Sequence, residues 1–202
     1  MKTKDKIILH SIDLFNRSGV VAVTTNHIAK ELNISPGNLY FHFANKEEII
    51  RHIFKQMCKE TYQLWRMKKG ASLIHPLDLI EKNFELFWKY RFFHREMYYL
   101  RRKDSVLSKM WKAHITKILK MITVVYRRWL KEQWMTPIRS QEEINFIVNV
   151  LLATASTFLQ FFESAERLPA KKHIENGKKY VARLLVHYTQ GQMRQDFDAF
   201  VG

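Results

Sequence analysis

Residues 35–43, with the sequence SPGNLYFHF, carry side chains that can contact a nucleic acid. The amide of Asn38 can pair with the edge of an adenine, and the ring of Phe41 can pack against the methyl group of a thymine. Tyr40 and His42 carry donors for phosphate oxygens, which position a protein on DNA without reading its sequence. These residue types at this spacing predict contact with DNA.

Three helix starts near this segment offer further groups for phosphates. Gly37 lets backbone N–H groups approach a phosphate closely, while the hydroxyl of Thr25 and the ammonium group of Lys46 lie at two other predicted helix starts. The candidate DNA-binding residues are Thr24, Thr25, Ser35, Pro36, Gly37, Asn38, Tyr40, Phe41, His42 and Lys46. Taken singly, each aromatic is typical of packing and the amide of a solvated surface, so the prediction depends on the whole set.

Two short helices joined by a tight turn must position these residues. Thr24 or Thr25 is predicted to cap the first helix. Asn33 falls where the turn needs a left-handed backbone, which asparagine tolerates better than most residues. Ser35 then caps the second helix, and Pro36 takes its first position, where a missing N–H is harmless.

The second short helix divides into a buried face and an exposed face. If Leu39 and Phe43 point to the core, the 100° step per residue leaves Gly37 and Phe41 on the outside. A brief helix that presents its outer face after a turn is typical of the helix-turn-helix, whose second helix enters the DNA major groove.

Composition narrows the class of protein. The chain has 202 residues, a formal net charge of +15 and one cysteine, Cys58, which excludes an internal disulfide. The positive charge favours polyanionic partners, and the amphipathic N-terminus lacks a signal-peptide pattern, so we expect a cytoplasmic protein. The nine histidines are scattered, and no hydrolase or nucleotide-binding motif occurs, so we expect no enzyme activity, cofactor or metal ion.

Residues 144–162 form the one stretch that resembles a membrane span, because they are apolar and uncharged. They nevertheless include polar residues such as Asn145, Asn149 and Gln160, which a lipid-exposed helix would leave without partners. We therefore predict a helix buried on most sides and no membrane partner.

Helical periodicity dominates the chain, and no strand alternation is evident, so the predicted class is all-α. Besides the two short helices, we predict helices at residues 3–18, 45–68 with a stop at Gly70, 76–93, 96–101, 104–134, 140–166 and 173–188, with breaks at Thr136-Pro137 and Leu168-Pro169. The fourth helix is expected to start with a capping box of Asn45 and Glu48. Residues 1–48 are the predicted three-helix DNA-binding domain, and residues 49–202 a helical bundle.

Residues 24–50, TTNHIAKELNISPGNLYFHFANKEEII, resemble the DNA-binding domain of the TetR family of bacterial transcriptional regulators. The resemblance implies a homodimer that binds a palindromic double-stranded operator, with a ligand-binding and dimerisation domain at residues 49–202. It also implies a repressor released by a small effector, and SPGNLYFHF is similar to members linked to fatty-acyl metabolism. Asn38 and Phe41 depart from the commoner family residues, which leaves the operator sequence open.

Aromatic residues in the second domain are spaced for inward faces. The candidates for an effector pocket are Phe84, Phe87, Trp88, Tyr98, Trp111 and Tyr126, while Phe92, Tyr99 and Trp129 share the spacing. An ordinary core explains the same spacing equally well. The helix at 140–166 and the last helix are expected to pack against their counterparts in the partner subunit.

Positive charge gathers outside the predicted DNA-binding domain. Residues 1–60 carry a net charge of +3, whereas residues 89–131 carry +11. A solvated helix face, attraction to DNA, or a site for the acidic head of a ligand each account for this charge. The competing hypothesis for the whole chain is a basic helical protein that binds lipid or acyl ligands, with incidental affinity for DNA.

Overall fold

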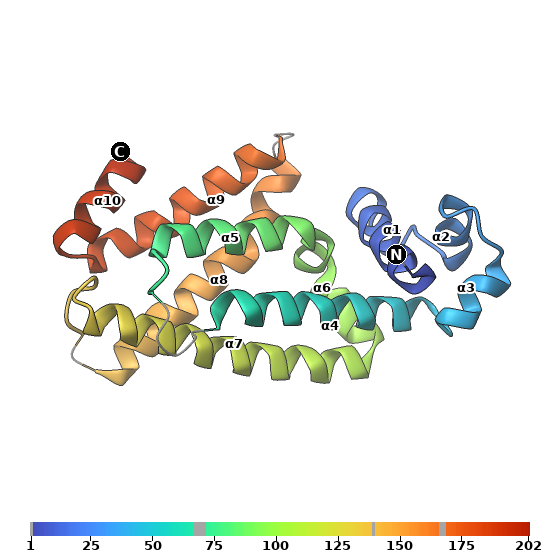
Figure 1. Cartoon of the computed structure of the whole chain (residues 1–202), viewed down its shortest axis with the longest axis horizontal. Helices are drawn as coiled ribbons and strands as arrows, with labels where there is room; N and C mark the ends of the chain where they lie inside the picture. Colours follow the sequence, from blue (N-terminus) through green and yellow to red (C-terminus); the bar gives the residue numbers. More distant parts are fainter. Residues whose placement is uncertain (1, 67–71, 139, 166–168) are drawn as a thin grey trace. The chain divides into compact units, whose positions relative to one another are not determined.

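The computed structural model describes residues 2–66, 72–138, 140–165 and 169–202. Within these ranges every regular secondary-structure element is a helix, which confirms the all-α class (Figure 1). They are α1 (Thr3–Ser18), α2 (Thr25–Glu31), α3 (Pro36–His42), α4 (Lys46–Trp65), α5 (Pro76–Lys89), α6 (Arg91–Lys103), α7 (Ser105–Lys131), α8 (Gln141–Ala165), α9 (Ala170–Leu185), the 3-10 turn η1 (Val186–Tyr188) and α10 (Gly191–Val201).

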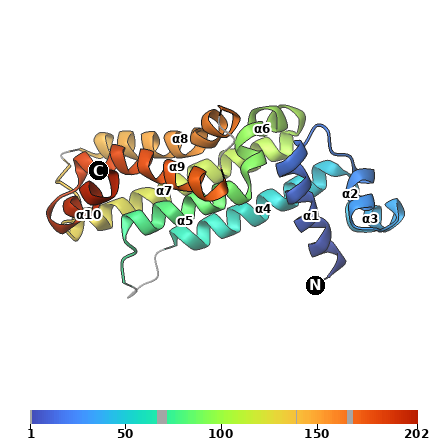
Figure 2. The same cartoon turned by 90° about the horizontal axis from the view of Figure 1, so that it is seen from above.

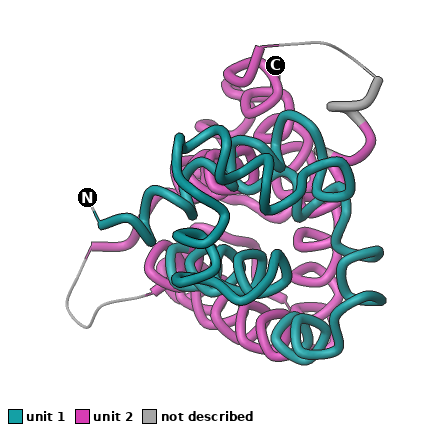
Figure 3. Tube along the Cα trace, turned by 90° about the vertical axis from the view of Figure 1, so that its right-hand side faces the viewer, with its two compact units in different colours: residues 1–60, 89–112 teal, residues 61–88, 113–202 magenta. Residues whose placement is uncertain are grey.

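The helices form two compact units, which Figure 3 colours separately. Unit 1 contains residues 1–60 and 89–112, and unit 2 contains residues 61–88 and 113–202. Helices α4 and α7 contribute residues to both units. The domain boundary predicted at residue 48 falls near the start of α4 and stays a prediction.

Unit 1 packs α1 against α2 and α6, and α2 against α3. The buried rings of Phe15 and Phe92 lie 5.3 Å apart between α1 and α6. The side chain of Asn16 donates to the carbonyl of Lys89 at 2.9 Å and accepts from the N–H of Phe92 at 3.1 Å. These contacts fix the helix that precedes the helix-turn-helix to the start of α6.

Unit 2 packs α9 between α8 and α10 (Figure 2). Its core is a cluster of aliphatic and aromatic side chains that includes Phe84, Tyr126 and Phe158. A methyl group on Gly177 would lie 2.3 Å from Cε1 of Phe84, so α9 approaches α5 at a point where only glycine fits. Helices α5 and α9 are therefore closely packed at this point.

The predicted helix at 76–93 starts correctly at Pro76 but its end is wrong, and the helix predicted at 96–101 is longer than expected at both ends. Helix α5 ends at Lys89, and α6 runs without interruption from Arg91 to Lys103. No glycine or proline marks this break. The side chain of Asn16 hydrogen-bonds to the carbonyl of Lys89 and to the N–H of Phe92. Helix α5 therefore ends where the backbone groups bond to a side chain that is 70 or more residues away in the sequence.

The C-terminal end also differs from the prediction. The expected helix at 173–188 begins earlier, at Ala170, and gives way to the 3-10 turn after Leu185. Helix α10, at Gly191–Val201, was missed; its first residue, Gly191, has a positive φ of 58°, and it buries Met193 and Phe197. The stop at Gly70, Leu168 and the helix end at residue 166 lie outside the described residues.

Candidate DNA-binding site

The caps and the turn of the helix-turn-helix follow the prediction. Thr24 precedes α2, and its hydroxyl accepts a hydrogen bond from the N–H of His27 at 3.2 Å. Asn33 has a φ of 53° in the turn. Ser35 caps α3 by accepting from the N–H of Asn38 at 3.2 Å, with Pro36 at the first helical position. Side-chain caps therefore set where both short helices begin.

Helix α3 has the predicted buried and exposed faces. Leu39 and Phe43 are 0% and 1% exposed, whereas the side chain of Phe41 is 85% exposed. Gly37 and Asn38 are also exposed. A methyl group on Gly37 would meet nothing closer than Ser35 Oγ at 3.9 Å, so the fold itself does not require glycine here. The outer face of α3 presents an amide, an open backbone and an aromatic ring.

Tyr40 and Thr25 form a link between the two short helices that the sequence did not reveal. The Tyr40 hydroxyl and Thr25 Oγ1 lie 2.9 Å apart, and either oxygen can donate. Both residues were expected to contact phosphates independently. In the structure the two hydroxyls contact each other, which links α2 to α3 at the surface.

Lys46 opens α4 and contacts the loop before α2. Its Nζ donates to the carbonyls of Val20 and Val23, both at 2.8 Å, which leaves one ammonium proton for another acceptor. The capping box of α4 is only half as predicted. The N–H of Glu48 donates to Asn45 Oδ1 at 2.9 Å, but the Glu48 carboxylate accepts from the N–H of Ala44 and not from that of Asn45.

The basic residues at 89–131 are divided among several roles. In unit 1, Lys89 pairs with Glu60 at 2.8 Å, Arg95 donates to the carbonyl of Asn16 at 2.7 Å, and Arg101 lies 5.8 Å from the ring centre of Trp111. Arg102 and Lys103 remain exposed at the end of α6. Part of this charge therefore stabilises unit 1.

The six effector-pocket candidates do not fall in one unit. Phe84, Phe87, Trp88 and Tyr126 belong to the hydrophobic cluster of unit 2. Trp111 belongs to unit 1 and packs against Phe54, with ring centres 6.1 Å apart.

The prediction that Tyr98 and Tyr99 face inward is wrong, because they are 69% and 43% exposed. Arg102 donates to the Tyr98 hydroxyl at 3.2 Å, and Lys103 lies over the Tyr99 ring. Basic neighbours on the same helix face therefore hold both tyrosines at the surface.

Three polar atoms in the unit 2 core have no hydrogen-bond partner among the described residues. They are the Tyr126 hydroxyl, Trp129 Nε1 and His173 Nδ1. The ring of His173 stacks on Trp88 at 5.1 Å. Burial raises the pKa of the Tyr126 hydroxyl well above its usual value, so that group is a neutral donor. Buried donors and acceptors without partners are uncommon, and they suit a ligand that carries polar atoms.

Helices α8 and α9 leave apolar side chains at the surface of unit 2. Phe146, Tyr180 and Leu184 are 63%, 47% and 38% exposed. An apolar cleft of about 530 Å³ between the two helices is lined by Phe146 and Leu184, among others. The expectation that residues 144–162 are buried on most sides is therefore too strong.

The described part of the chain contains neither a membrane-spanning helix nor a cluster of metal-binding side chains. No helix there is long and apolar enough to cross a membrane. In the same ranges, no group of three or more His, Cys, Asp or Glu side chains is arranged to hold a metal ion.

A capped helix pair, an asparagine turn with positive φ and an outward-facing second helix define a DNA-binding protein of the helix-turn-helix class. Residues 7–53 match the model of a family described as "Bacterial regulatory proteins, tetR family". Residues 53–197 match the model of a family described as "Bacterial transcriptional repressor". The chain belongs to the TetR family of bacterial regulatory proteins.

Similar proteins agree with this assignment. The chain is 30% identical to a TetR-family transcriptional regulator from Marinobacter aquaeolei VT8, with a TM-score of 0.91 over 100% of this chain and 98% of that one. It is 48% identical over 48 residues to the biofilm operon icaADBC HTH-type negative transcriptional regulator IcaR of Staphylococcus epidermidis, covering 24% of this chain and 26% of IcaR. It is 35% identical over 69 residues to the HTH-type transcriptional regulator QacR of Staphylococcus aureus, covering 34% of this chain and 37% of QacR.

Proposed function

We propose that this protein binds an operator sequence through α3 and represses transcription until a small effector releases it. The observation that carries the proposal is the outer face of α3, where Phe41 is 85% exposed between the buried anchors Leu39 and Phe43. A ring exposed to this extent on a helix of seven residues contributes little to folding. In contact with DNA, the Phe41 ring can pack against the methyl group of a thymine.

The candidate residues divide into those that read bases and those that hold the backbone. Asn38 and Phe41 are exposed and would contact base edges, and Gly37 would let the DNA backbone come close. The remaining candidates, Thr24, Thr25, Ser35, Pro36, Tyr40, His42 and Lys46, supply phosphate contacts or position α3.

A homodimer would place two such helices on a palindrome. The exposed apolar residues of α8 and α9 support these helices as the subunit interface, because patches of this kind mark sites of association. Successive major-groove half-sites then require the two α3 helices to be about 34–36 Å apart. Since the partner is chromosomal DNA, we place the protein in the cytoplasm.

Charge at the proposed interface tests the dimer directly. Leu184→Glu would bury a carboxylate between subunits, so sedimentation should show monomers at concentrations where the original chain is dimeric. The control is Val124→Glu on α7, also at an exposed position in unit 2. If both variants stay dimeric, α8 and α9 are not the interface.

The effector is proposed to bind in the aromatic cluster of unit 2, which contains Phe84, Phe87, Trp88 and Tyr126. The unpartnered atoms of Tyr126, Trp129 and His173 support a ligand with an apolar body and polar atoms, and a fatty-acyl compound fits that description. Such a ligand acts by favouring a head separation other than the one the operator needs.

Selection of bound duplexes from random DNA tests the regulator directly. A short palindrome is the expected product, and fatty acids or acyl thioesters should lower its affinity. The competing proposal, a lipid-binding protein with incidental DNA affinity, predicts no enriched palindrome and binding to anionic vesicles as strong as to any duplex. That second result would overturn the proposed function.

A further inference from the structure

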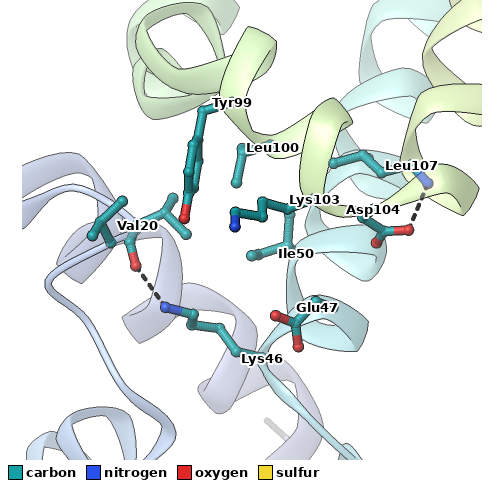
Figure 4. Close-up of a pocket in the computed structure, with 10 residues that line it drawn as sticks. Val20, Lys46, Glu47, Ile50, Tyr99, Leu100, Lys103, Asp104 and Leu107 are labelled. Atoms are coloured by element: carbon teal, nitrogen blue, oxygen red, sulfur yellow. Dashed lines mark hydrogen bonds between the residues drawn. The ribbon is translucent and has the colours of Figure 1, made fainter.

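A cleft of about 300 Å³ lies within unit 1, apart from the aromatic cluster of unit 2. Its walls come from the loop after α1, the first turns of α4 and the junction of α6 with α7 (Figure 4). The volume is at the lower end of the range for small-molecule sites, about 300–1,000 Å³.

Three hydrogen-bond donors line this cleft. Figure 4 shows the ammonium group of Lys103 and the hydroxyl of Tyr99 directed into it, while the ammonium group of Lys46 is directed to the carbonyl of Val20 at the cleft wall. Neither lysine forms a salt bridge within the described parts of the chain, and the Lys103 ammonium lies 5.8 Å from the ring centre of Tyr99. Two cations and a phenol that share one cleft suit an anion.

The carboxylates near these donors are mostly engaged elsewhere. Asp104 pairs with Arg51 at 2.8 Å and accepts from the N–H groups of Val106 and Leu107. Glu96 accepts from the N–H of Val20 at 3.0 and 3.1 Å.

Glu47 is the remaining carboxylate on the wall. It is exposed and extends toward a different side of the cleft from the Tyr99 hydroxyl. With Asp104 paired to Arg51, the two lysines outnumber the one remaining carboxylate on the wall.

Part of the cleft wall is apolar. Ile50 of α4, Leu100 of α6 and Leu107 of α7 line it, and all three are buried. A purely inorganic anion would leave this surface without contacts. A ligand with an apolar body and one negative group matches both parts of the wall.

We propose that this cleft binds a small organic carboxylate, with the carboxylate between Lys46 and Lys103 and the apolar body against Ile50, Leu100 and Leu107. The bound carboxylate takes the one remaining proton of the Lys46 ammonium group, which also donates to the carbonyls of Val20 and Val23, and so competes with the phosphate contact proposed for Lys46. Occupancy of the cleft thereby acts on the loop before α2 and on the start of α4.

Calorimetric titration of the full-length, DNA-free protein tests the site. The probes are benzoate, phenylacetate and hexanoate, each compared with its uncharged amide. At least one acid is expected to bind about tenfold more tightly than its amide, because charge-assisted hydrogen bonds contribute about 1.5–3 kcal/mol. If all three acids bind no better than their amides, the proposal is overturned.

Variants locate the binding. Lys103→Gln should weaken the acid about tenfold and leave its amide unchanged, and Tyr99→Phe should weaken the acid less. Lys109→Gln, at an exposed position on α7 outside the cleft, is the matched control and should bind like the original chain. Equal behaviour of Lys103→Gln and Lys109→Gln would overturn the proposal, as would loss of binding in Trp88→Phe of unit 2. Because no DNA is present, failure of operator binding would count only against the proposed function.

Discussion

Helix α3 and the aromatic cluster of unit 2 both contain aromatic side chains, but α3 exposes one of them and the cluster buries them. Helix α3 is anchored by Leu39 and Phe43 and exposes Phe41, whereas unit 2 buries Phe84 and Tyr126. A ring at the surface contributes to contacts with a partner, and a ring in a close-packed core contributes to folding. Substitutions in the two regions should therefore separate DNA binding from stability.

The largest expected contrast is between Phe84→Ala and Phe41→Ala. Phe84 is 1% exposed and contacts Phe87, Phe158 and the surface above Gly177, so its removal should lower the free energy of unfolding by about 3–5 kcal/mol. Phe41→Ala should change it by no more than about 0.5 kcal/mol. Chemical denaturation of both variants measures the difference, and similar losses would break the comparison.

The second prediction concerns pH and belongs to unit 2. Burial, with Lys117 nearby, lowers the pKa of His114 to about 4, and its Nδ1 lies 3.1 Å from the Tyr62 hydroxyl. Because the folded state binds the proton less readily than the unfolded state, the stability from neutral His114 is present above pH 6.5 and is lost as the pH falls toward 4.

The expected loss is on the order of 2–3 kcal/mol between pH 7 and pH 4. As the pH falls across this range, the midpoint temperature of thermal unfolding should fall more steeply for the original chain than for His114→Gln, which has no proton to gain. Parallel curves for the two proteins would contradict the assignment of this loss to His114.

Features set by neighbouring residues were predicted better than features set by distant contacts. The helix caps, the Asn33 turn and the faces of α3 depend on neighbours within a few residues. The spacing of residue types in the sequence was therefore enough to predict them. The break after Lys89 depends on Asn16, and the close contact at Gly177 depends on Phe84. The local spacing of residues does not indicate such distant partners. For that reason the predicted effector pocket combined Tyr98 and Trp111 with residues that lie in the other unit.

A third prediction separates base reading from backbone contact within unit 1. Asn38→Ala should cost about 1–3 kcal/mol on the selected operator and little on unrelated DNA, because a base contact is lost. Lys46→Ala should weaken binding to all duplexes alike and lower the salt dependence, because a phosphate contact is lost. Fluorescence anisotropy with both duplexes at several salt concentrations measures each effect. Uniform weakening by both variants would refute this division of roles.

The smallest expected effect tests whether Thr25 and Tyr40 act as one unit. Their oxygens lie 2.9 Å apart at the surface, where water replaces a lost partner, so Thr25→Val and Tyr40→Phe should barely change stability. Each should weaken operator binding by about 0.5–1 kcal/mol, because α3 loses a contact that orients it. If the hydroxyls act through one another, the double variant binds no worse than either single one, which a double-mutant cycle detects. Additive losses would instead mean that each hydroxyl contacts DNA independently, as the sequence alone first suggested.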